Sequence, residues 1–286
     1  MRVIVTGGSG LTGRHVVAEL VAHGYEVLNV DRVPPNQPLA PYKLVEMEEL
    51  GQVYGSLSGA DAIVHLAAIP RPTFHTNEVV FRTNVISTYH VFEAAAQLGI
   101  ARVVWASSMS VLGFPFYYRP FAPRYVPVDE AHPRLPQDVY ALSKVLGEEM
   151  AEAFVRRSSM TVVSLRLAWV HTPESFREQL VPLWEDHAAG ASNLWAWLDA
   201  RDAARAARLA LEAELSGHEP FFIAARTSFM REPSADLVRR VYPESTIRPG
   251  LQGNGSLIST EKAERLLGYR PVHPWELFLD SGTEES

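Results

Sequence analysis

The 286-residue sequence contains no cysteine, which excludes a disulfide scaffold, a zinc site with thiolate ligands and a cysteine nucleophile. It also lacks long apolar runs: Val3–Val5 is only as long as a strand and has no signal-peptide architecture, and no later run approaches the ~18 residues of a membrane span. Basic residues number 26 against 33 acidic ones and form no dominant stripe, which disfavours nucleic-acid and anionic-membrane partners. What remains, 47% hydrophobic and 21% charged, predicts an ordinary folded protein of the cytoplasm.

The first half of the chain alternates short apolar runs with stretches of helical spacing. Strands are predicted at 3–5, 25–30, 61–66, 102–106 and 161–167, and helices after the first strand and at 84–98 and 139–154. In the last of these helices, Leu142, Val145 and Leu146 are among the residues predicted to face the core. Strands separated by helices pair in parallel, so the sequence predicts a doubly wound parallel α/β sheet of the Rossmann type, which binds ligands at the carboxyl ends of its strands.

Two stretches depart from this alternation. Residues 113–137 contain six prolines and a cluster of aromatic residues, so a long loop is predicted there, and it is open whether 114–125 caps a ligand or packs on a dimer partner or a small lobe. After Thr172 the pattern weakens, although a helix over 202–214 and a strand over 221–225 are expected. We therefore predict a main α/β domain over 1–171, rejoined by 194–225, and a small C-terminal lobe for the substrate over 172–193 and 226–286.

A glycine turn, Gly7-x-x-Gly10-x-x-Gly13, follows the first predicted strand and opens a helix. In that context the helix amino terminus offers free N–H groups to a pyrophosphate, and residues without Cβ let the phosphates approach. Asp31 lies 31 − 13 = 18 residues past the last glycine, near the ~20 expected of an acid that receives the adenosine ribose. The pattern predicts dinucleotide binding and favours NAD over NADP, although the neighbouring Arg32 weakens the preference for NAD.

Tyr140 and Lys144 lie four residues apart on a predicted helix and therefore share a face. With ten tyrosines and three lysines in the chain, only about 0.1 such pairs are expected by chance. A phenol of pKa ~10 is a weak base near neutrality, but an adjacent ammonium and an oxidised nicotinamide favour its ionised form, which can take the proton of an alcohol. Ser107 and Ser108, which follow the strand over 102–106, are predicted to supply a hydroxyl that orients the substrate oxygen.

Further motifs surround these residues in a fixed order. They are Thr6 to Gly13, His65-Leu66-Ala67-Ala68, Ala106-Ser107-Ser108-Met109-Ser110-Val111-Leu112-Gly113, Tyr140-Ala141-Leu142-Ser143-Lys144 and Lys262-Ala263-Glu264-Arg265-Leu266-Leu267-Gly268-Tyr269-Arg270-Pro271. Over nearly the whole chain the set resembles the extended short-chain dehydrogenases/reductases, also called the NAD-dependent epimerase/dehydratase family. The resemblance implies an NAD-dependent oxidoreductase and a homodimer formed by pairing two helices from each subunit.

The resemblance also implies a role for each matching residue. Tyr140 is the general base or acid, Lys144 its partner, Ser108 the ligand of the substrate hydroxyl, and Asn84 the helix asparagine of the family, although Ser87 stands where glycine is usual. The residues expected to touch the cofactor are Gly7, Ser9, Gly10, Leu11, Gly13, Asp31, Arg32, Glu46, Met47, Leu66, Ala67, Ala68, Ser107, Tyr140 and Lys144.

Two departures from the nucleotide-sugar enzymes of the family, and one likeness to another of its branches, indicate the class of substrate. Trp169 stands where nucleotide-sugar epimerases of the family usually carry asparagine, and the chain is short for an enzyme that encloses a nucleotide sugar. The stretch Thr172-Pro173-Glu174 followed by Arg177 resembles the uronate dehydrogenases, whose arginine grips the sugar carboxylate. Arg177 and Trp169 join Ser108 and Tyr140 as predicted substrate ligands.

A uronate or sugar dehydrogenase acting on a small sugar or sugar acid is the favoured prediction. A nucleotide-sugar epimerase or dehydratase is the alternative, because return of the hydride to the other face gives an inverted product. A regulatory protein that senses NAD(P) without turnover is an alternative of another class. The presence of Tyr140 and Lys144 disfavours it, because such proteins typically lack this pair. His65, Trp195 and Trp197 are predicted to be core residues, and no metal site is expected.

Overall fold

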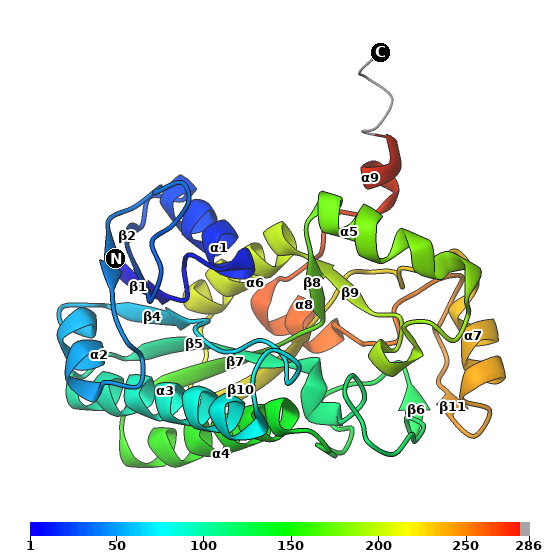
Figure 1. Cartoon of the computed structure of the whole chain (residues 1–286), viewed down its shortest axis with the longest axis horizontal. Helices are drawn as coiled ribbons and strands as arrows, with labels where there is room; N and C mark the ends of the chain where they lie inside the picture. The colour runs from blue at the N-terminus through cyan, green and yellow to red at the C-terminus, as the bar shows by residue number, and fades with distance from the viewer. Residues whose placement is uncertain (281–286) are drawn as a thin grey trace.

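The computed structural model describes residues 1–280 and is built around a seven-stranded parallel sheet (Figure 1). Its strands lie in the order β10–β7–β5–β4–β1–β2–β3. Their bounds are β1 Arg2–Thr6, β2 Glu26–Asp31, β3 Tyr42–Leu44, β4 Ala62–His65, β5 Arg102–Ser108, β7 Thr161–Leu167 and β10 His218–Ile223. The strand order runs outward in opposite directions from β1 and β4, so the predicted doubly wound, Rossmann-type α/β sheet is confirmed and its ligand crevice lies at the carboxyl ends of these two strands.

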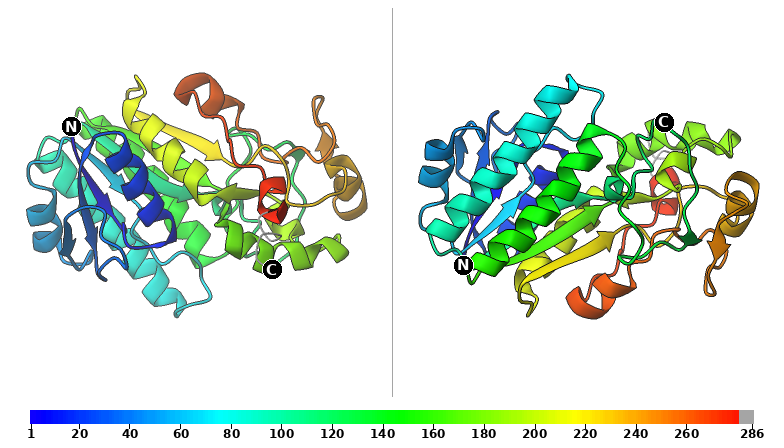
Figure 2. Two further views of the ribbon diagram at one scale, coloured as in Figure 1. Left: turned by 90° about the horizontal axis from the view of Figure 1, so that it is seen from above. Right: turned by 90° about the horizontal axis from the view of Figure 1, so that it is seen from below.

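Helices cover both faces of the sheet. On one face α1 (Leu11–Ala22) packs with α6 (Ala200–Glu212), and on the other lie α2 (Leu50–Leu57), α3 (Asn77–Gln97) and α4 (Val139–Arg157), as the views from above and below show (Figure 2). The alternation along β1 explains the two layers, because successive side chains of a strand point to opposite faces. Val3 and Val5 join one apolar cluster, and Ile4 joins the other.

Most of the remaining elements gather beyond the carboxyl ends of β5 and β7, in the right-hand part of Figure 1. They are β6 Tyr125–Val126 paired with β11 Thr246–Ile247, β8 Trp169–His171 paired with β9 Trp197–Asp199, and the helices α5 Pro173–Gln179, α7 Ser234–Val241, α8 Glu261–Leu267 and α9 Glu276–Asp280. Short 3-10 turns occupy Met109–Leu112, Val181–Glu185 and Ala191–Asn193. Within residues 1–280, no helix has both the length and the apolar character needed to cross a bilayer.

Two details of the sequence prediction are wrong. The helix predicted from Asn84 begins seven residues earlier, at Asn77, because only Val80 in its first two turns is fully buried and the apolar period is weak there. In α4 the predicted inner face is wrong in its first half, since Leu142 is 40% exposed and Val145 and Leu146 are only partly buried, whereas Phe154 is buried as predicted. The buried residues of α4 are Tyr140, Ala141, Ser143, Lys144, Gly147, Glu148, Ala151 and Phe154. His65, Trp195 and Trp197 are fully buried, as predicted.

Candidate active site

The glycine turn lies between β1 and α1, at the carboxyl edge of the sheet. Gly7 has a φ of +73°, and a Cβ on it would lie 2.6 Å from the backbone nitrogen of Ala67. A Cβ on Gly13 would lie 2.0 Å from the Gly7 carbonyl oxygen, so both positions require glycine. Gly10 begins α1 with extended backbone and without a side-chain cap, which leaves the N–H groups that follow it, from the exposed Leu11 onward, available to an anion.

Asp31 closes β2 beside this turn, as its spacing predicts. Its Oδ2 accepts the backbone N–H of Ser9 at 3.0 Å, and its Oδ1 accepts the backbone N–H of Arg32 at 2.7 Å. Asn29 donates to Ser9 Oγ at 3.2 Å and so ties the turn to β2 from a second point. The carboxylate is therefore held at the end of the turn by backbone donors, where it can accept the hydroxyls of a ribose.

The other residues predicted to touch the cofactor lie in the segments that follow β3 and β4. Leu66, Ala67 and Ala68 continue β4 and are partly buried, and after β3 Met47 is buried whereas Glu46 is exposed. The residues present fit a dinucleotide, because the turn is a cradle that Cβ atoms would fill and it is flanked by free helix N–H groups and by a fixed carboxylate.

Tyr140 lies in the first turn of α4, whose amino terminus is capped by Asp138. The Asp138 Oδ1 accepts the backbone N–H of Ala141 at 2.9 Å. The Tyr140 side chain, in a residue only 8% exposed, lies close enough to Ser108 at the end of β5 for that serine to act on the pKa of the phenol. The Ser108 Oγ itself donates to Ser110 Oγ and accepts the Ser110 N–H, both at 3.1 Å. The structure thus brings together the phenol and the serine that the sequence assigned to one reaction.

The aromatic-proline loop forms one wall around the phenol ring. Phe116 meets the Tyr140 ring edge-on, with 6.3 Å between the ring centroids, and Ile69 and Val80 complete the apolar cluster. Gln137 holds the loop to the start of α4, since its Oε1 accepts the backbone N–H of Arg119 at 2.8 Å. The loop therefore covers part of the Tyr140 ring through Phe116.

Lys144 lies one turn after Tyr140 on the same buried face of α4. Its Nζ donates to the Ala106 carbonyl of β5 at 2.7 Å and lies 5.0 Å from the centroid of the Trp105 ring and 5.6 Å from that of Tyr140. The Trp105 indole packs directly on α4, because a Cβ on Gly147 would lie 2.2 Å from it. The amine is therefore fixed between the helix and the strand, beside the phenol.

Without a bound cofactor, burial governs the pKa values of the pair. Burial raises the pKa of Tyr140 to about 12, the interaction with Ser108 acts to lower it, and the charge of Asp138 raises it further. Burial lowers the pKa of Lys144 from its ordinary 10.5 to about 7. Loss of water penalises both charged forms, so burial favours the neutral phenol and weakens the hold of the amine on its proton.

Asn84 sits on α3 and is 4% exposed. Its Oδ1 accepts the Ile69 N–H at 2.8 Å, and its Nδ2 donates to the Ile69 carbonyl at 3.0 Å and to Ser143 Oγ at 3.3 Å. These contacts tie the segment after β4 to α4, next to Tyr140. In this structure Asn84 acts as a positioning residue for the loop that packs on the phenol.

Sequence reasoning missed Glu148, which lies one turn after Lys144 on the same face. It is 1% exposed and accepts the hydroxyl of Ser107 at 2.8 Å and two donors of Arg166 at 2.9 and 2.8 Å. The signal was present in the sequence, because residues 140, 144 and 148 repeat at the four-residue spacing of one helix face. A charged residue on that face predicts a buried partner, which here comes from β7.

Arg177 and Trp169 lie in the C-terminal part of the structure. The Arg177 Nη1 donates to the Phe278 carbonyl of α9 at 2.9 Å. Arg177 lines a cavity of about 450 Å³ whose wall consists of Pro173, Glu174, Arg177, Arg201, His273, Leu277 and Phe278. Trp169 is half-buried on β8 with its ring 4.5 Å from that of His171. The wall of the cavity includes neither Tyr140 nor Ser108, so contact of Arg177 with the substrate stays a prediction.

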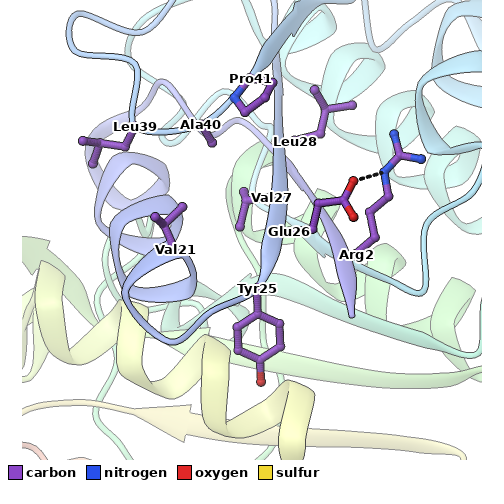
Figure 3. A pocket seen from close by; sticks show the side chains of 9 residues that line it. All are labelled: Arg2, Val21, Tyr25, Glu26, Val27, Leu28, Leu39, Ala40 and Pro41. Atoms are coloured by element: carbon purple, nitrogen blue, oxygen red, sulfur yellow. Dashed lines mark ion pairs between the residues drawn. The ribbon is translucent and has the colours of Figure 1, made fainter.

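A second cavity, of about 330 Å³, lies at the opposite edge of the sheet (Figure 3). It is bounded by the start of β1 and β2, where Arg2 and Glu26 form an ion pair at 3.5 Å, and by Val21, Tyr25 and Leu39. It faces the amino-terminal ends of the strands, whereas the glycine turn and Ser108 lie at their carboxyl ends. It is therefore separate from the candidate active site.

Comparison with known proteins gives both sequence and structural matches. The profile described as "NAD dependent epimerase/dehydratase family" matches residues 3–224. The chain is 32% identical over 170 residues to a uronate dehydrogenase of Pseudomonas putida, covering 58% of this chain and 60% of that protein. It is 28% identical over 219 residues to an L-arabinose 1-dehydrogenase (NAD(P)(+)) of Haloferax volcanii, covering 75% and 84%.

In three dimensions, a short-chain dehydrogenase/reductase superfamily protein from Agrobacterium tumefaciens with bound NAD aligns over 98% of this chain and 95% of its own, with a TM-score of 0.75 and 23% identity. A UDP-galactose 4-epimerase also matches, with a TM-score of 0.72. The alignment with the Pseudomonas putida protein spans about three fifths of that protein's length. Dehydrogenases and an epimerase thus occur together among the matches.

Proposed function

The chain belongs to the NAD-dependent epimerase/dehydratase family, and we propose that it is a dehydrogenase that oxidises a hydroxyl carbon of a sugar or sugar acid, with uronates as the first candidate substrates. The observation that carries the proposal is that the phenol of Tyr140, the end of β5 at Ser108 and the buried amine of Lys144 lie together, with the amine 5.6 Å from the centroid of the Tyr140 ring. A phenol, a hydroxyl and an amine at the carboxyl edge of the sheet can together take a proton from an alcohol beside a bound dinucleotide.

The cofactor site is assigned from the groups that face the same crevice. The turn from Gly7 to Gly13 would hold the pyrophosphate of NAD, Asp31 the adenosine ribose and Lys144 the nicotinamide ribose. When bound, NAD accepts the hydride from the substrate carbon. Arg32 is exposed beside Asp31, and this permits a secondary use of NADP.

In the proposed reaction Tyr140 Oη takes the hydroxyl proton of the substrate. Ser108 Oγ holds the substrate oxygen, and its closeness to the Tyr140 hydroxyl favours the phenolate. In this reaction protonated Lys144 would place a positive charge one helical turn from the phenol, and a nearby positive charge favours the phenolate. Phe116 and Ile69 keep water away from the phenol. General-base catalysis of this kind contributes ~10²- to 10⁴-fold.

The class of substrate is inferred from the relatives and from two residues. Relatives named as a uronate dehydrogenase and an L-arabinose 1-dehydrogenase support a free sugar or sugar acid. Arg177 is the proposed ligand of a carboxylate, and Trp169 takes the position at which the family's nucleotide-sugar epimerases carry asparagine. The alternative is a nucleotide-sugar epimerase, supported by the UDP-galactose 4-epimerase among the structural matches.

The function is tested by incubating the purified protein with NAD and, separately, with free uronates, neutral sugars and nucleotide sugars. We expect NADH to accumulate with a uronate, followed by its absorbance. A product inverted at one carbon, formed without net NADH, would mean that the protein is an epimerase and not a dehydrogenase. Binding of NAD without conversion of any of these substrates would favour the sensing protein.

Substitution of Arg177 by methionine should raise the KM for a uronate by about 10- to 100-fold, the worth of a hydrogen bond to a charged group, and leave the KM for the matching neutral sugar nearly unchanged. Kinetics with both sugars measure this. Glu178→Gln, an exposed neighbour on α5, is the control. An equal rise in KM for both sugars would mean that Arg177 supports the structure around Phe278 and does not bind the sugar carboxylate.

We also propose a homodimer in which α3 and α4 pair with their copies. Phe81 and Tyr89 on α3 and Leu142 on α4 are 38%, 41% and 40% exposed, and Val145 and Leu146 are only partly buried. An apolar face of this kind is typical of a helix interface. The molar mass measured by light scattering decides between one and two chains.

A further inference from the structure

Glu148 is a buried carboxylate that joins three elements around the candidate active site. It stands on α4, two turns after Tyr140 and one after Lys144. It accepts the Ser107 hydroxyl of β5 at 2.8 Å and Nε and Nη2 of Arg166 on β7 at 2.9 and 2.8 Å. Arg134, from the loop before α4, adds a donor at 3.2 Å.

This ion pair lies in the interior, since the side chains of Glu148 and Arg166 are 2% and 4% exposed. Burial acts to raise the pKa of the Glu148 carboxyl, but the hydrogen bonds and charge of Arg166, with Ser107 and Arg134, bring it below its ordinary value. A buried ion pair is seldom a gain in stability over well-packed apolar residues. The contacts of Glu148 indicate a role other than stability.

The geometry supplies that role through adjacent residues of β5. Ser107 pairs with Arg166 across the β5–β7 ladder, so Glu148 binds both members of one register pair. The next residue, Ser108, is the last of β5, where the chain leaves the sheet, and it lies near the phenol of Tyr140, on whose pKa it acts. Because ionised Glu148 accepts only, Ser107 must donate its proton to it and is held in one orientation.

We propose that Glu148, with Arg166, is a positioning residue that fixes the end of β5 against α4 and thereby sets the Ser108–Tyr140 contact. The proposal rests on the function proposed above, in which that contact takes part in the reaction. Glu148 acts through Ser107 and touches neither the phenol nor the amine in the contacts described. The charged groups facing Tyr140 itself are Lys144 and Asp138.

The test is a set of variants measured by the pH profile of kcat/KM. In Glu148→Gln and in Ser107→Ala, loss of the link loosens the Ser108 contact that favours the phenolate, so the profile should move to higher pH by about half a unit or more. We expect kcat to fall about 10-fold in Glu148→Gln, with a smaller change in KM. In the double variant the two shifts should not add, because both act through one hydrogen bond.

Glu149→Gln is the matched control, since Glu149 is the next residue of the same helix, binds the same Arg134 and is exposed. It should keep the profile of the unsubstituted protein. If Glu148→Gln does not fold, Ser107→Ala decides alone, because it removes one oxygen only. Unmoved profiles in the folded variants would overturn the proposal, as would additive shifts.

A readout independent of turnover separates this proposal from the proposed function. Crystal structures of the unsubstituted protein and of Ser107→Ala give the separation of Ser108 Oγ from Tyr140 Oη. A longer separation in the variant supports the positioning role even if no sugar is oxidised, in which case only the proposed function fails. An unchanged separation overturns the positioning role even if the enzyme is an active dehydrogenase.

Discussion

Replacement of Tyr140 by phenylalanine should lower kcat by ~10²-fold or more and leave the affinity for NAD within about twofold. The change removes the one oxygen proposed to take the substrate proton. The ring stays, and with it the packing on Phe116, Ile69 and Val80. Initial rates followed by NADH absorbance and NAD titration of the protein's fluorescence measure the two quantities separately.

The matched control for this variant is Tyr118→Phe. Tyr118 belongs to the same aromatic-proline loop but is 71% exposed, so loss of its hydroxyl should change neither rate nor affinity. Tyr140→Phe also loses the interaction of the phenol hydroxyl with Ser108, which is worth at most about 1 kcal/mol of unfolding free energy, so the fold should persist. Conversion of a substrate at equal rates by the variant and the unsubstituted protein would refute the assignment of Tyr140.

Much of the fold follows from the local pattern of the first 170 residues. β7 has the predicted bounds, and β1, β2, β4 and β5 lie within two residues of theirs, because each is a short apolar run between a helix and a turn. β3 was not predicted as a strand with bounds, since Tyr42, Lys43 and Leu44 are all exposed at the sheet edge and show no alternation. Family membership, inferred from the order of motifs, is confirmed by the profile match.

The face of α4 shows why the candidate site was only partly predictable. Its apolar residues were expected to face the sheet, yet Lys144 and Glu148 do so, because Ala106, Ser107 and Arg166 supply partners for them. Those partners come from strands distant in sequence, and no periodicity within α4 reveals them. The spacing of Tyr140 and Lys144 identified the pair, but the pKa directions depend on burial, which is a tertiary property.

The second large effect concerns Lys144, for which stability and activity should move in opposite directions. Lys144→Met should lower kcat by ~10²-fold or more, because the proposed positive charge beside the phenolate and the proposed ligand of the nicotinamide ribose are both removed. The same change should raise the unfolding free energy of the cofactor-free protein at pH 7. The reason is that folding buries an amine whose pKa falls from 10.5 to about 7.

The sign and the pH range of the stability gain follow from that shift. The folded pKa lies below the unfolded one, so burial of this amine costs the unsubstituted protein no unfolding free energy above about pH 10. The cost grows as the pH falls toward 7. A shift of this size corresponds to a few kcal/mol, about 1 kcal/mol of which is offset in the variant by loss of the donor to the Ala106 carbonyl. We expect a net gain of about 2–4 kcal/mol at pH 7 that disappears near pH 10.

Urea unfolding of the cofactor-free protein at pH 7 and pH 10 measures the gain, and Lys43→Met, at an exposed lysine of β3, controls for the loss of a lysine as such. A gain of the same size at both pH values would mean that methionine simply packs better, and the buried amine would not be the cause. No gain at pH 7 would mean that Lys144 is charged in the folded protein and already compensated. In that case the amine would be ready to assist the phenolate before any ligand binds, and the pH profile of turnover would depend on Tyr140 alone.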